Sequence, residues 1–256
     1  MKTPKRKNLV VVRAGDCSLH PVWLSGDATR NFDIFISYFG STKDKYRSQA
    51  EYYESAVGLK FPALARLLTE HGDLFSSYDA FWFPDDDLLT DPETISGMFD
   101  LFHAYALWLA QPALGPGSHV SYPATAQRPN SRLRFSGFVE IMCPLFSRTS
   151  LEMLGSTFSS SSSGWGLDFL WPHLLKNPQT GIAILDETPV VHTRPLGIGS
   201  FYDQCKKQNV DPEAELNQIL KAHGLVWQRD MPIYKTVPKS SPLKDSIQTE
   251  PNQCAA

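Results

Sequence analysis

The sequence feature that most restricts the fold is an aromatic run that leads directly into three aspartates. Residues 81–83 read Phe-Trp-Phe, and after a single proline come Asp85, Asp86 and Asp87. A short apolar run of this kind is typical of a strand that is buried in a sheet. Consecutive carboxylates, in contrast, need water, a cation or hydrogen-bond donors around them. The chain therefore has to bury a strand here and bring the end of that strand to a polar site.

Strand-like and helix-like segments alternate through the first half of the chain. Short β-branched or aromatic runs predict strands at residues 9–12, 32–38 and 78–83. Apolar residues spaced by three and four predict a helix over 61–68 that ends near Gly72, and Asp91 followed by Pro92 is typical of a helix start. The alternation predicts an α/β fold, with a Rossmann-type mixed, mostly parallel sheet flanked by helices. Ligands of such sheets bind beyond the carboxyl ends of the strands.

The second half continues the pattern less regularly. Further strands are predicted at residues 107–111, 138–142, 181–185 and 189–191, and further helices at 149–154, 169–175 and 211–223. An unbroken serine run at 159–163 is flexible by composition, and it is either a lid that closes over bound donor or a plain linker. We expect one domain over residues 1–233. The segment 234–256, rich in Pro, Ser, Lys and Gln, is expected to be a flexible tail.

Composition excludes several classes of protein. The charged fraction is 20% and the formal net charge is -3, without the basic face of a nucleic-acid binder. No apolar run reaches the ~20 residues that a transmembrane helix needs. The apolar run near the N-terminus stops at Arg13, too short for a signal peptide, and the four cysteines are irregularly spaced. A cytoplasmic protein with reduced thiols is the expectation.

The aspartate triplet predicts a metal site. Adjacent carboxylates repel one another, which raises their pKa values and costs stability unless a cation lies between them. Carboxylate oxygens favour Mg²⁺ or Mn²⁺, which bind one or two protein carboxylates and complete their shell with phosphate oxygens and water. In an extended segment Asp85 and Asp87 point the same way, and Asp86 points elsewhere. We predict Asp85 and Asp87 as metal ligands; a solvated acidic turn that caps the next helix is the alternative.

A strand that ends in Asp-x-Asp resembles the metal- and nucleotide-diphosphate-binding signature of glycosyltransferases with the GT-A fold. Four stretches also appear in the same order as in the domain-of-unknown-function family 707, whose members look like GT-A glycosyltransferases: residues 78–88, 111–114, 137–148 and 165–168. That family usually carries Asp-Glu-Asp, and this chain has Asp86 at the middle position. The serine run at 159–163 is unusual for the family. The resemblance implies a GT-A-like fold, a nucleotide-diphosphate sugar donor and Mn²⁺ (or Mg²⁺) as cofactor.

The resemblance also implies a catalytic residue. Residues 164–168, Gly-Trp-Gly-Leu-Asp, resemble the Trp-Gly-x-Asp/Glu stretch of many GT-A enzymes, where the carboxylate lies beneath the acceptor hydroxyl. In an inverting transfer Asp168 would accept the proton of that hydroxyl as general base. Trp165 would stack on a sugar ring, and Gly166 would let the acceptor approach the backbone. The alternative is structural, with Asp168 in the first turn of a helix near the positive end of its dipole.

Two residues at the end of a late strand extend the predicted donor site. In several GT-A families a histidine at this place is the third protein ligand of the metal, and imidazole suits Mn²⁺ better than Mg²⁺. His192 is predicted in that role, although a histidine is more often an ordinary polar residue. Arg194 is predicted to bind the diphosphate, because a guanidinium group pairs with phosphate through two parallel hydrogen bonds.

Further donor contacts are predicted from position. Arg13 and Gly15 follow the first strand and Tyr38 ends the second, where a GT-A fold holds the nucleotide base. Lys60, just before a predicted helix, is a candidate diphosphate contact, and a surface lysine is the alternative. Asp85 and Asp86 complete the predicted donor site.

Glu140 is a candidate for acceptor binding, because it lies among apolar neighbours where an unpaired carboxylate is costly. The alternative is an ion pair with Arg132, Arg134 or Arg148, and the sequence does not separate the two.

The leading hypothesis is therefore a metal-dependent glycosyltransferase of the hexosyltransferase class, inverting, with a nucleotide-sugar and a carbohydrate acceptor as partners. One alternative is a sugar nucleotidyltransferase, although residues 13–18 are poor in the glycine that such enzymes carry after the first strand. Another is a non-catalytic carbohydrate- or nucleotide-sugar-binding protein on the same fold.

Overall fold

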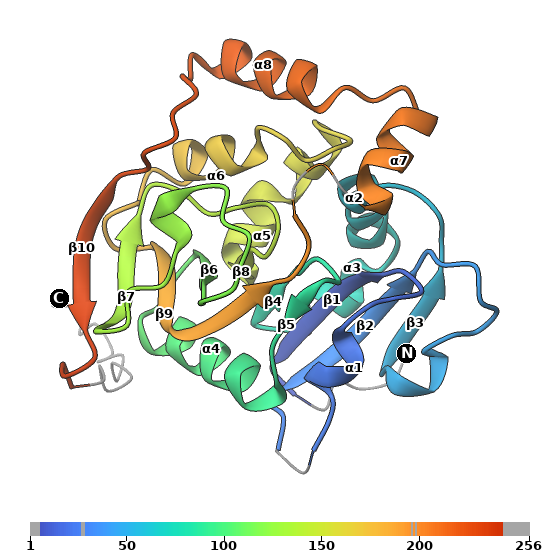
Figure 1. The fold of residues 1–256 in the computed structure, drawn as a ribbon, viewed down its shortest axis with the longest axis horizontal. Coiled ribbons are helices and arrows are strands. Elements are labelled where there is room, and N and C mark those ends of the chain that lie inside the picture. The colour runs from blue at the N-terminus through green and yellow to red at the C-terminus, as the bar shows by residue number, and fades with distance from the viewer. Residues whose placement is uncertain (1–5, 27–28, 196, 198, 243–256) are drawn as a thin grey trace, which may run out of the picture.

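The computed structural model describes residues 6–26, 29–195, 197 and 199–242, which form one mixed sheet with helices on both faces (Figure 1). The strands are β1 (Asn8–Ala14), β2 (Phe32–Tyr38), β3 (Tyr52–Ser55), β4 (Ala80–Trp82), β5 (Leu88–Leu89), β6 (Leu109–Leu114), β7 (Ser131–Ser136), β8 (Leu145–Ser147), β9 (Ile182–His192) and β10 (Ile233–Pro238). The helices are α1 (His20–Trp23), α2 (Lys60–Glu70), α3 (Gly72–Phe75), α4 (Pro92–Ala104), α5 (Arg148–Leu154), α6 (Leu167–Leu175), α7 (Ser200–Lys207) and α8 (Pro212–His223). Short 3₁₀ turns cover Arg47–Gln49, Pro123–Thr125 and Gly155–Ser159.

The described strands form a 10-stranded sheet in the order β10-β7-β9-β6-β8-β4-β1-β2-β3, and β5 pairs with β9. β1 is parallel to β2 and to β4, β2 is parallel to β3, and β6 is parallel to β9. β8 lies antiparallel between β4 and β6, and β7 lies antiparallel between β9 and β10. Only β7 and β8 therefore run against the common direction of this path, and the predicted mixed, mostly parallel α/β sheet is confirmed.

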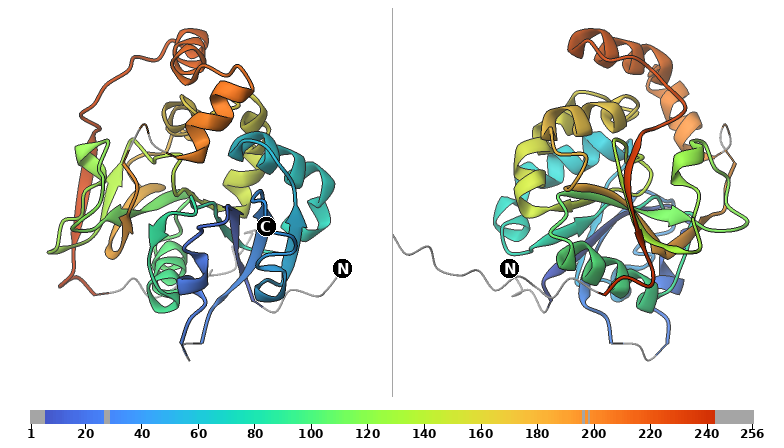
Figure 2. Two further views of the ribbon diagram at one scale, coloured as in Figure 1. Left: turned by 45° about the vertical axis from the view of Figure 1, so that its right-hand side comes forward. Right: turned by 90° about the vertical axis from the view of Figure 1, so that its left-hand side faces the viewer.

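The alternation of β1 explains why helices cover both faces. Its side chains point in turn to opposite sides of the sheet. Val10 and Val12 join the core beneath α4 and α1, whereas Leu9 and Val11 join the core beneath α2, α5 and α6. The two helical layers are visible below and above the sheet in Figure 1, and again from the side in Figure 2. A strand buried on both faces tends to be apolar along its middle, as β1 is over residues 9–12.

Two predicted segments differ in the structure. Residues 138–142 form no strand but a buried loop, whose polar backbone groups bond across the fold: Glu140 N donates to Gln111 Oε1 at 2.6 Å, and Met142 O accepts from Asp85 N at 2.8 Å. The predicted end of a helix near Gly72 is also displaced, because α2 ends at Glu70 and the glycine begins α3.

The beginning of the predicted C-terminal tail is also different. Residues 234–238 lie in β10, which pairs with β7 and lengthens the sheet. The interpretation of residues 234–256 as a flexible tail is therefore wrong over β10, and residues 243–256 lie outside the described part of the chain. The strand was hidden because most of its residues are exposed, Lys235 and Thr236 among them, and its partner lies about a hundred residues earlier.

Among the residues that the structure describes, none of the helices has both the length and the apolar character needed to cross a membrane. The cytoplasmic location stays a prediction.

The direction of the strands brings distant segments together at one edge. The carboxyl ends of β1, β2, β4 and β9 and the start of β8 all lie at the same edge of the sheet, because β8 runs opposite to its neighbours. The segments that follow or precede these ends are the ones that the sequence singled out: Gly15, Tyr38, Asp85, Glu140 and His192. This is the edge where ligands of such sheets bind.

Candidate active site

The aspartate triplet lies in the turn between β4 and β5, and each carboxylate has a basic partner from a distant segment. Lys60 Nζ, at the start of α2, lies 2.7 Å from Asp85 Oδ1. Arg194 Nη1, beyond β9, lies 3.0 Å from Asp86 Oδ1. His192 Nε2 lies 3.4 Å from Asp87 Oδ2. The expected repulsion inside the triplet is therefore relieved in part by the protein itself.

Asp86 is the most firmly held of the three. Its Oδ2 accepts a 2.7 Å hydrogen bond from the backbone N–H of Gly15, directly after β1. A Cβ on Gly15 would lie 3.0 Å from the ring of Phe39 and 3.4 Å from that same Oδ2, so glycine permits the close approach. Asp86 thus ties the ends of β1 and β4 together, while its other oxygen faces Arg194.

Asp87 and His192 form the pair with the best fit to a metal ion. Asp87 Oδ1 is buried and has no hydrogen-bond partner in the described part of the chain. His192 Nδ1 lies 2.9 Å from His119 O, so its proton faces that carbonyl and Nε2 faces Asp87. Burial lowers the pKa of His192, but the hydrogen bond and charge of Asp87 outweigh burial and leave that pKa raised. An unpartnered carboxylate oxygen beside an imidazole is an incomplete ligand set.

The triplet is not a complete metal cage by itself. No group of three or more His, Cys, Asp or Glu side chains is placed to hold an ion within residues 6–26, 29–195, 197 and 199–242. Asp85 is turned to Lys60, whose ammonium also donates to Ile141 O at 2.9 Å and Met142 O at 3.1 Å. The charge of Asp87 raises the pKa of Asp85 more than that of Asp86 does, after the larger effects of desolvation and Lys60. That order fits the expected placement of Asp85 and Asp87 on the same side.

A second acidic pair lies beside the triplet. Asp168 is in the first turn of α6 and Glu140 is in the loop before β8, and both are buried, at 7% and 6% exposure. Burial raises the pKa of Asp168 to about 7, against opposing backbone hydrogen bonds such as the one from Phe169 N at 3.1 Å. Burial raises the pKa of Glu140 to about 8, and the charge of Asp168 adds to it. Both acids are therefore partly protonated near neutral pH, Glu140 more than Asp168.

The three arginines considered as partners of Glu140 are all engaged elsewhere. Arg132 pairs with Glu187, Arg134 with Asp186, and Arg148 with Asp79. Among the described side chains, Thr125 Oγ1 reaches the Glu140 carboxyl group at 3.4 Å. The ion-pair alternative is therefore wrong, and the role in acceptor binding stays a prediction.

The remaining predicted contacts have structural partners. The buried guanidinium of Arg13 donates to Ser37 Oγ at 2.7 Å and to Gly58 O at 2.6 Å, and burial lowers its pKa to about 10. The hydroxyl of Tyr38 donates to Asp16 Oδ1 at 2.5 Å. These contacts hold the ends of β1, β2 and β3 together, and whether Arg13 or Tyr38 also contacts a nucleotide stays a prediction.

The serine run is not a loose linker. Glu215 of α8 accepts hydrogen bonds from Ser161 Oγ at 3.0 Å, Ser162 N at 2.9 Å, Ser163 N at 2.8 Å and Ser163 Oγ at 2.6 Å. The same two serine hydroxyls accept from the backbone N–H groups that follow, those of residues 164 and 165. The helix α8 thus fixes the loop that leads into Asp168.

The two glycines around Trp165 are needed for packing. Gly164 and Gly166 have φ of +87° and +95°, a region that L side chains rarely adopt. A Cβ on Gly164 would lie 2.2 Å from the ring of Phe61, and one on Gly166 would lie 3.1 Å from Ile219 of α8. Trp165 is partly exposed between them. Acceptor contacts by Trp165 and Gly166 stay predictions, beside this structural reason for the glycines.

Replacing Glu215 with glutamine is expected to destabilise the fold by about 1–3 kcal/mol, because the new amide would face N–H and O–H donors that it cannot satisfy. These hydrogen bonds outweigh the effect of burial and lower the pKa of Glu215. The stabilisation is therefore present above the unfolded-state value of 4.5 and is lost as pH falls through the lower folded value. Urea denaturation at pH 7 and pH 4 measures it. Glu213→Gln, an exposed acid in the same turn, is the control; equal losses for both variants would contradict the role of Glu215.

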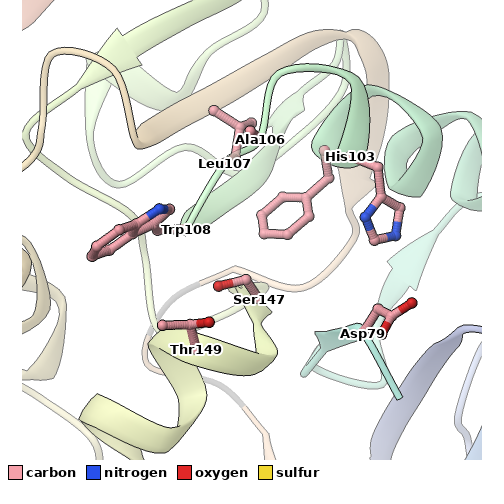
Figure 3. Close-up of a pocket in the computed structure, with 8 residues that line it drawn as sticks. Asp79, His103, Ala106, Leu107, Trp108, Ser147 and Thr149 are labelled. Carbon is pink, nitrogen blue, oxygen red and sulfur yellow. The ribbon is translucent and has the colours of Figure 1, made fainter. Parts of the chain in front are cut away.

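The described cavities lie away from these acids. One of about 270 Å³ is lined by Asp79, His103, Trp108 and Ser147 among others (Figure 3). Asp79 precedes β4 and Trp108 precedes β6, so this pocket lies at the opposite edge of the sheet from Asp85. The other is lined by Pro21, Leu24, Arg30 and Gln49. Neither of these two cavities contains a residue of the candidate site.

Sequence reasoning missed Glu215, which holds the serine run before Asp168, and it missed Thr125 and Tyr122, which lie near Glu140. Glu215 is in an ordinary amphipathic helix and Tyr122 is in a polar loop, so no local pattern distinguishes them.

Comparison with known proteins gives a fold but no family. No protein-family model matches the chain, and no curated protein matches it. The fold is similar to that of S. aureus TarS, with a TM-score of 0.52 at 12% sequence identity. That match covers 85% of this chain and 43% of the TarS chain, so the chain spans less than half of TarS. A structure of TarS 1–349 in complex with UDP-GlcNAc matches with a TM-score of 0.50 at 14% identity, covering 85% of this chain and 72% of that one.

Proposed function

We propose that this chain is a glycosyltransferase that moves a sugar from a nucleotide-diphosphate donor to a carbohydrate acceptor, with hexose transfer as the specific class. The observation that carries the proposal is the meeting of two acidic groups at the carboxyl edge of the sheet. Asp86 and Asp87 face Arg194 and His192, and the buried pair of Asp168 and Glu140 lies beside them. The similarity of the fold to that of S. aureus TarS is further support.

The donor site is proposed to hold a divalent cation. The unpartnered Oδ1 of Asp87 and the imidazole of His192 fit Mn²⁺, and Asp85 joins them if Lys60 turns away. Such a cation, once bound, neutralises charge on the leaving nucleoside diphosphate.

Two basic side chains suit the donor phosphates. Arg194 keeps 35% of its side-chain surface exposed although it contacts Asp86, so part of its guanidinium is free to pair with phosphate. Lys60 lies on the other side of the triplet and could turn from Asp85 to the donor. Gly15 would orient the site from beneath by holding Asp86.

Asp168 is proposed as the general base of an inverting transfer. The acceptor hydroxyl loses its proton to Asp168 as its oxygen attacks the anomeric carbon and the bond to the diphosphate breaks. A base is most effective when its pKa is near the working pH, and burial brings that of Asp168 to about 7. Glu140, protonated in that range, can donate a hydrogen bond to the acceptor.

Thermal denaturation with UDP-sugars tests the donor site, with UDP-GlcNAc as the first donor because TarS has been seen with it. A donor at a hundredfold excess over its dissociation constant adds about 2.7 kcal/mol of stability. We expect stabilisation only when Mn²⁺ is present, and a loss of most of it in Asp87→Asn.

Asp73→Asn, an exposed acid on α3, is the control and should keep the full shift. A chain that gains no stability from any UDP-, GDP-, ADP- or CMP-sugar with Mn²⁺ would count against the proposal. Stabilisation without Mn²⁺ that is unchanged in Asp87→Asn would contradict the metal site while keeping the donor.

A further inference from the structure

Four segments converge on the buried pair of Asp168 and Glu140. The loop before β8 carries Phe138 and Glu140, and α6 carries Asp168 and Phe169. The 3₁₀ turn Pro123–Thr125 follows Tyr122 and reaches Glu140 through its last residue. The fourth segment is the connection from α8 to β10, whose Met231 belongs to the same buried cluster as Phe138 and Ala124.

Aromatic rings fill the space between these segments. The ring centroids of Tyr122 and Phe138 are 4.4 Å apart, those of Phe138 and Phe169 5.5 Å, and those of Tyr122 and Phe169 6.4 Å. Phe138 is fully buried and Met231 nearly so, whereas Tyr122 and Phe169 are half-buried. The cluster is therefore closed to solvent at Phe138 and Met231 and partly open to solvent at Tyr122 and Phe169.

Trp227 lies on the partly open side of the cluster, near Tyr122. It belongs to the connection from α8 to β10, which is anchored to the loop of Phe138 by the 3.0 Å hydrogen bond from Gly137 N to Pro232 O. The Trp227 side chain lies near the hydroxyl of Tyr122, and 52% of the residue's surface is exposed. Its neighbours Gln228, Arg229 and Asp230 are exposed and polar. Trp227 therefore offers about half of a large aromatic side chain to solvent, beside exposed polar residues.

We propose that Trp227 and Tyr122 form the platform on which a pyranose ring of the acceptor lies. One face of a pyranose carries C–H groups of slight positive charge, which fit the negative face of an aromatic ring. Its hydroxyl groups need polar partners at the rim, and residues 228–230 supply them. This subsite is distinct from the predicted contacts of Trp165 and Gly166.

The position of the platform fits an acceptor rather than a donor. Thr125 links Tyr122 to the acids, because its Oγ1 lies 2.8 Å from Tyr122 O and 3.4 Å from Glu140 Oε1. Phe169 follows Asp168 directly in α6. A sugar seated on Trp227 and Tyr122 therefore presents its hydroxyl groups toward the proposed base, while the donor contacts lie at Asp86, Asp87 and Arg194. The assignment as acceptor rests on the proposed function; the binding of a sugar to the platform does not.

Saturation-transfer NMR with neutral trisaccharides tests the platform. The probes are trimers of glucose, galactose, mannose and N-acetylglucosamine, each with and without UDP and Mn²⁺. We expect at least one trimer to bind, with the strongest transfer to ring C–H protons. Trp227→Ala should weaken that binding at least tenfold, Trp227→Phe should restore most of it, and Tyr122→Phe should weaken it less than Trp227→Ala does.

Val226→Ala is the matched control, because Val226 is 80% exposed and adjacent to Trp227, and it should change binding less than twofold. Absence of binding by every trimer, or binding that is the same in Trp227→Ala as in the parent chain, would overturn the inference. Thermal denaturation with UDP-sugars, run on the same variants, separates it from the proposed function: trimer binding that depends on Trp227 in a chain with no donor binding keeps the platform and removes the transferase.

Discussion

Replacing Asp168 with asparagine is expected to slow sugar transfer by about 10²- to 10⁴-fold, the usual contribution of general-base catalysis, while donor binding is retained. Asparagine has nearly the shape of aspartate and can still accept the hydrogen bond from Phe169 N through its carbonyl oxygen. It cannot take a proton from the acceptor. The rate of UDP release in the presence of acceptor, compared with the donor-induced shift in thermal denaturation, separates catalysis from binding.

The pH dependence of the transfer rate is a second test of Asp168→Asn. Asp168 must be ionised to act as a base, so transfer by the parent chain should increase as pH rises through about 7, and this limb should be absent in Asp168→Asn. The stability effect has the opposite direction. A folded-state pKa of about 7 against 3.8 means that stability from this group is fully present below about pH 4 and is lost as pH rises through 7. Asp168→Asn should therefore gain stability relative to the parent chain over that range.

The control for this variant is Asp73→Asn, which also changes an aspartate in the first turn of a helix but lies exposed on α3. A transfer rate in Asp168→Asn within threefold of the parent chain would remove the base from the proposal. Tight ligand binding with no turnover in either form would favour the non-catalytic alternative.

The parts of the fold that could be predicted are those specified by neighbouring residues. Asp91 caps α4 by accepting from Thr94 N, and Pro92 follows it, so the start of that helix is fixed within four residues. β1 and β2 are mostly apolar and are buried along their length. Residues 138–142 carry the same apolar signal but pack as a loop, because the backbone partners come from Gln111 and Asp85 rather than from an adjacent strand.

In the candidate site, too, only what neighbouring residues specify could be predicted. That Asp85, Asp86 and Asp87 lie at the carboxyl end of a buried strand follows from the sequence, and so does the proximity of His192. Their partners do not follow, since Lys60, Gly15 and Arg194 come from 25 to 108 residues away. The expectation that the carboxylates needed a cation for want of any partner was therefore too simple. The raised pKa of Glu140 also requires that Arg132, Arg134 and Arg148 pair with other carboxylates, and the whole fold determines those pairs.

The largest effect on stability is expected at Arg134, a residue that supports the candidate site from behind. Arg134 of β7 and Asp186 of β9 are both fully buried and pair through two hydrogen bonds, Nε to Oδ2 at 2.8 Å and Nη2 to Oδ1 at 2.9 Å. The same guanidinium donates to Ala124 O at 2.6 Å and to Ala126 O at 2.7 Å. It therefore holds the turn whose Thr125 reaches Glu140.

Arg134→Met is expected to cost about 3–5 kcal/mol of unfolding free energy, because it leaves a buried carboxylate without its counter-charge. Urea denaturation monitored by tryptophan fluorescence measures it. Arg47→Met is the control, since Arg47 pairs with Asp44 on the surface at 59% and 49% exposure and such pairs contribute about 0–1 kcal/mol. The double variant Arg134→Met, Asp186→Leu leaves no charge buried, so it should recover part of the lost stability. Recovery should be incomplete, because the carbonyls of residues 124 and 126 lose their hydrogen-bond donor. A midpoint for Arg134→Met no lower than that of Arg47→Met would show that the pair is not what holds this turn and, through it, the surroundings of Glu140.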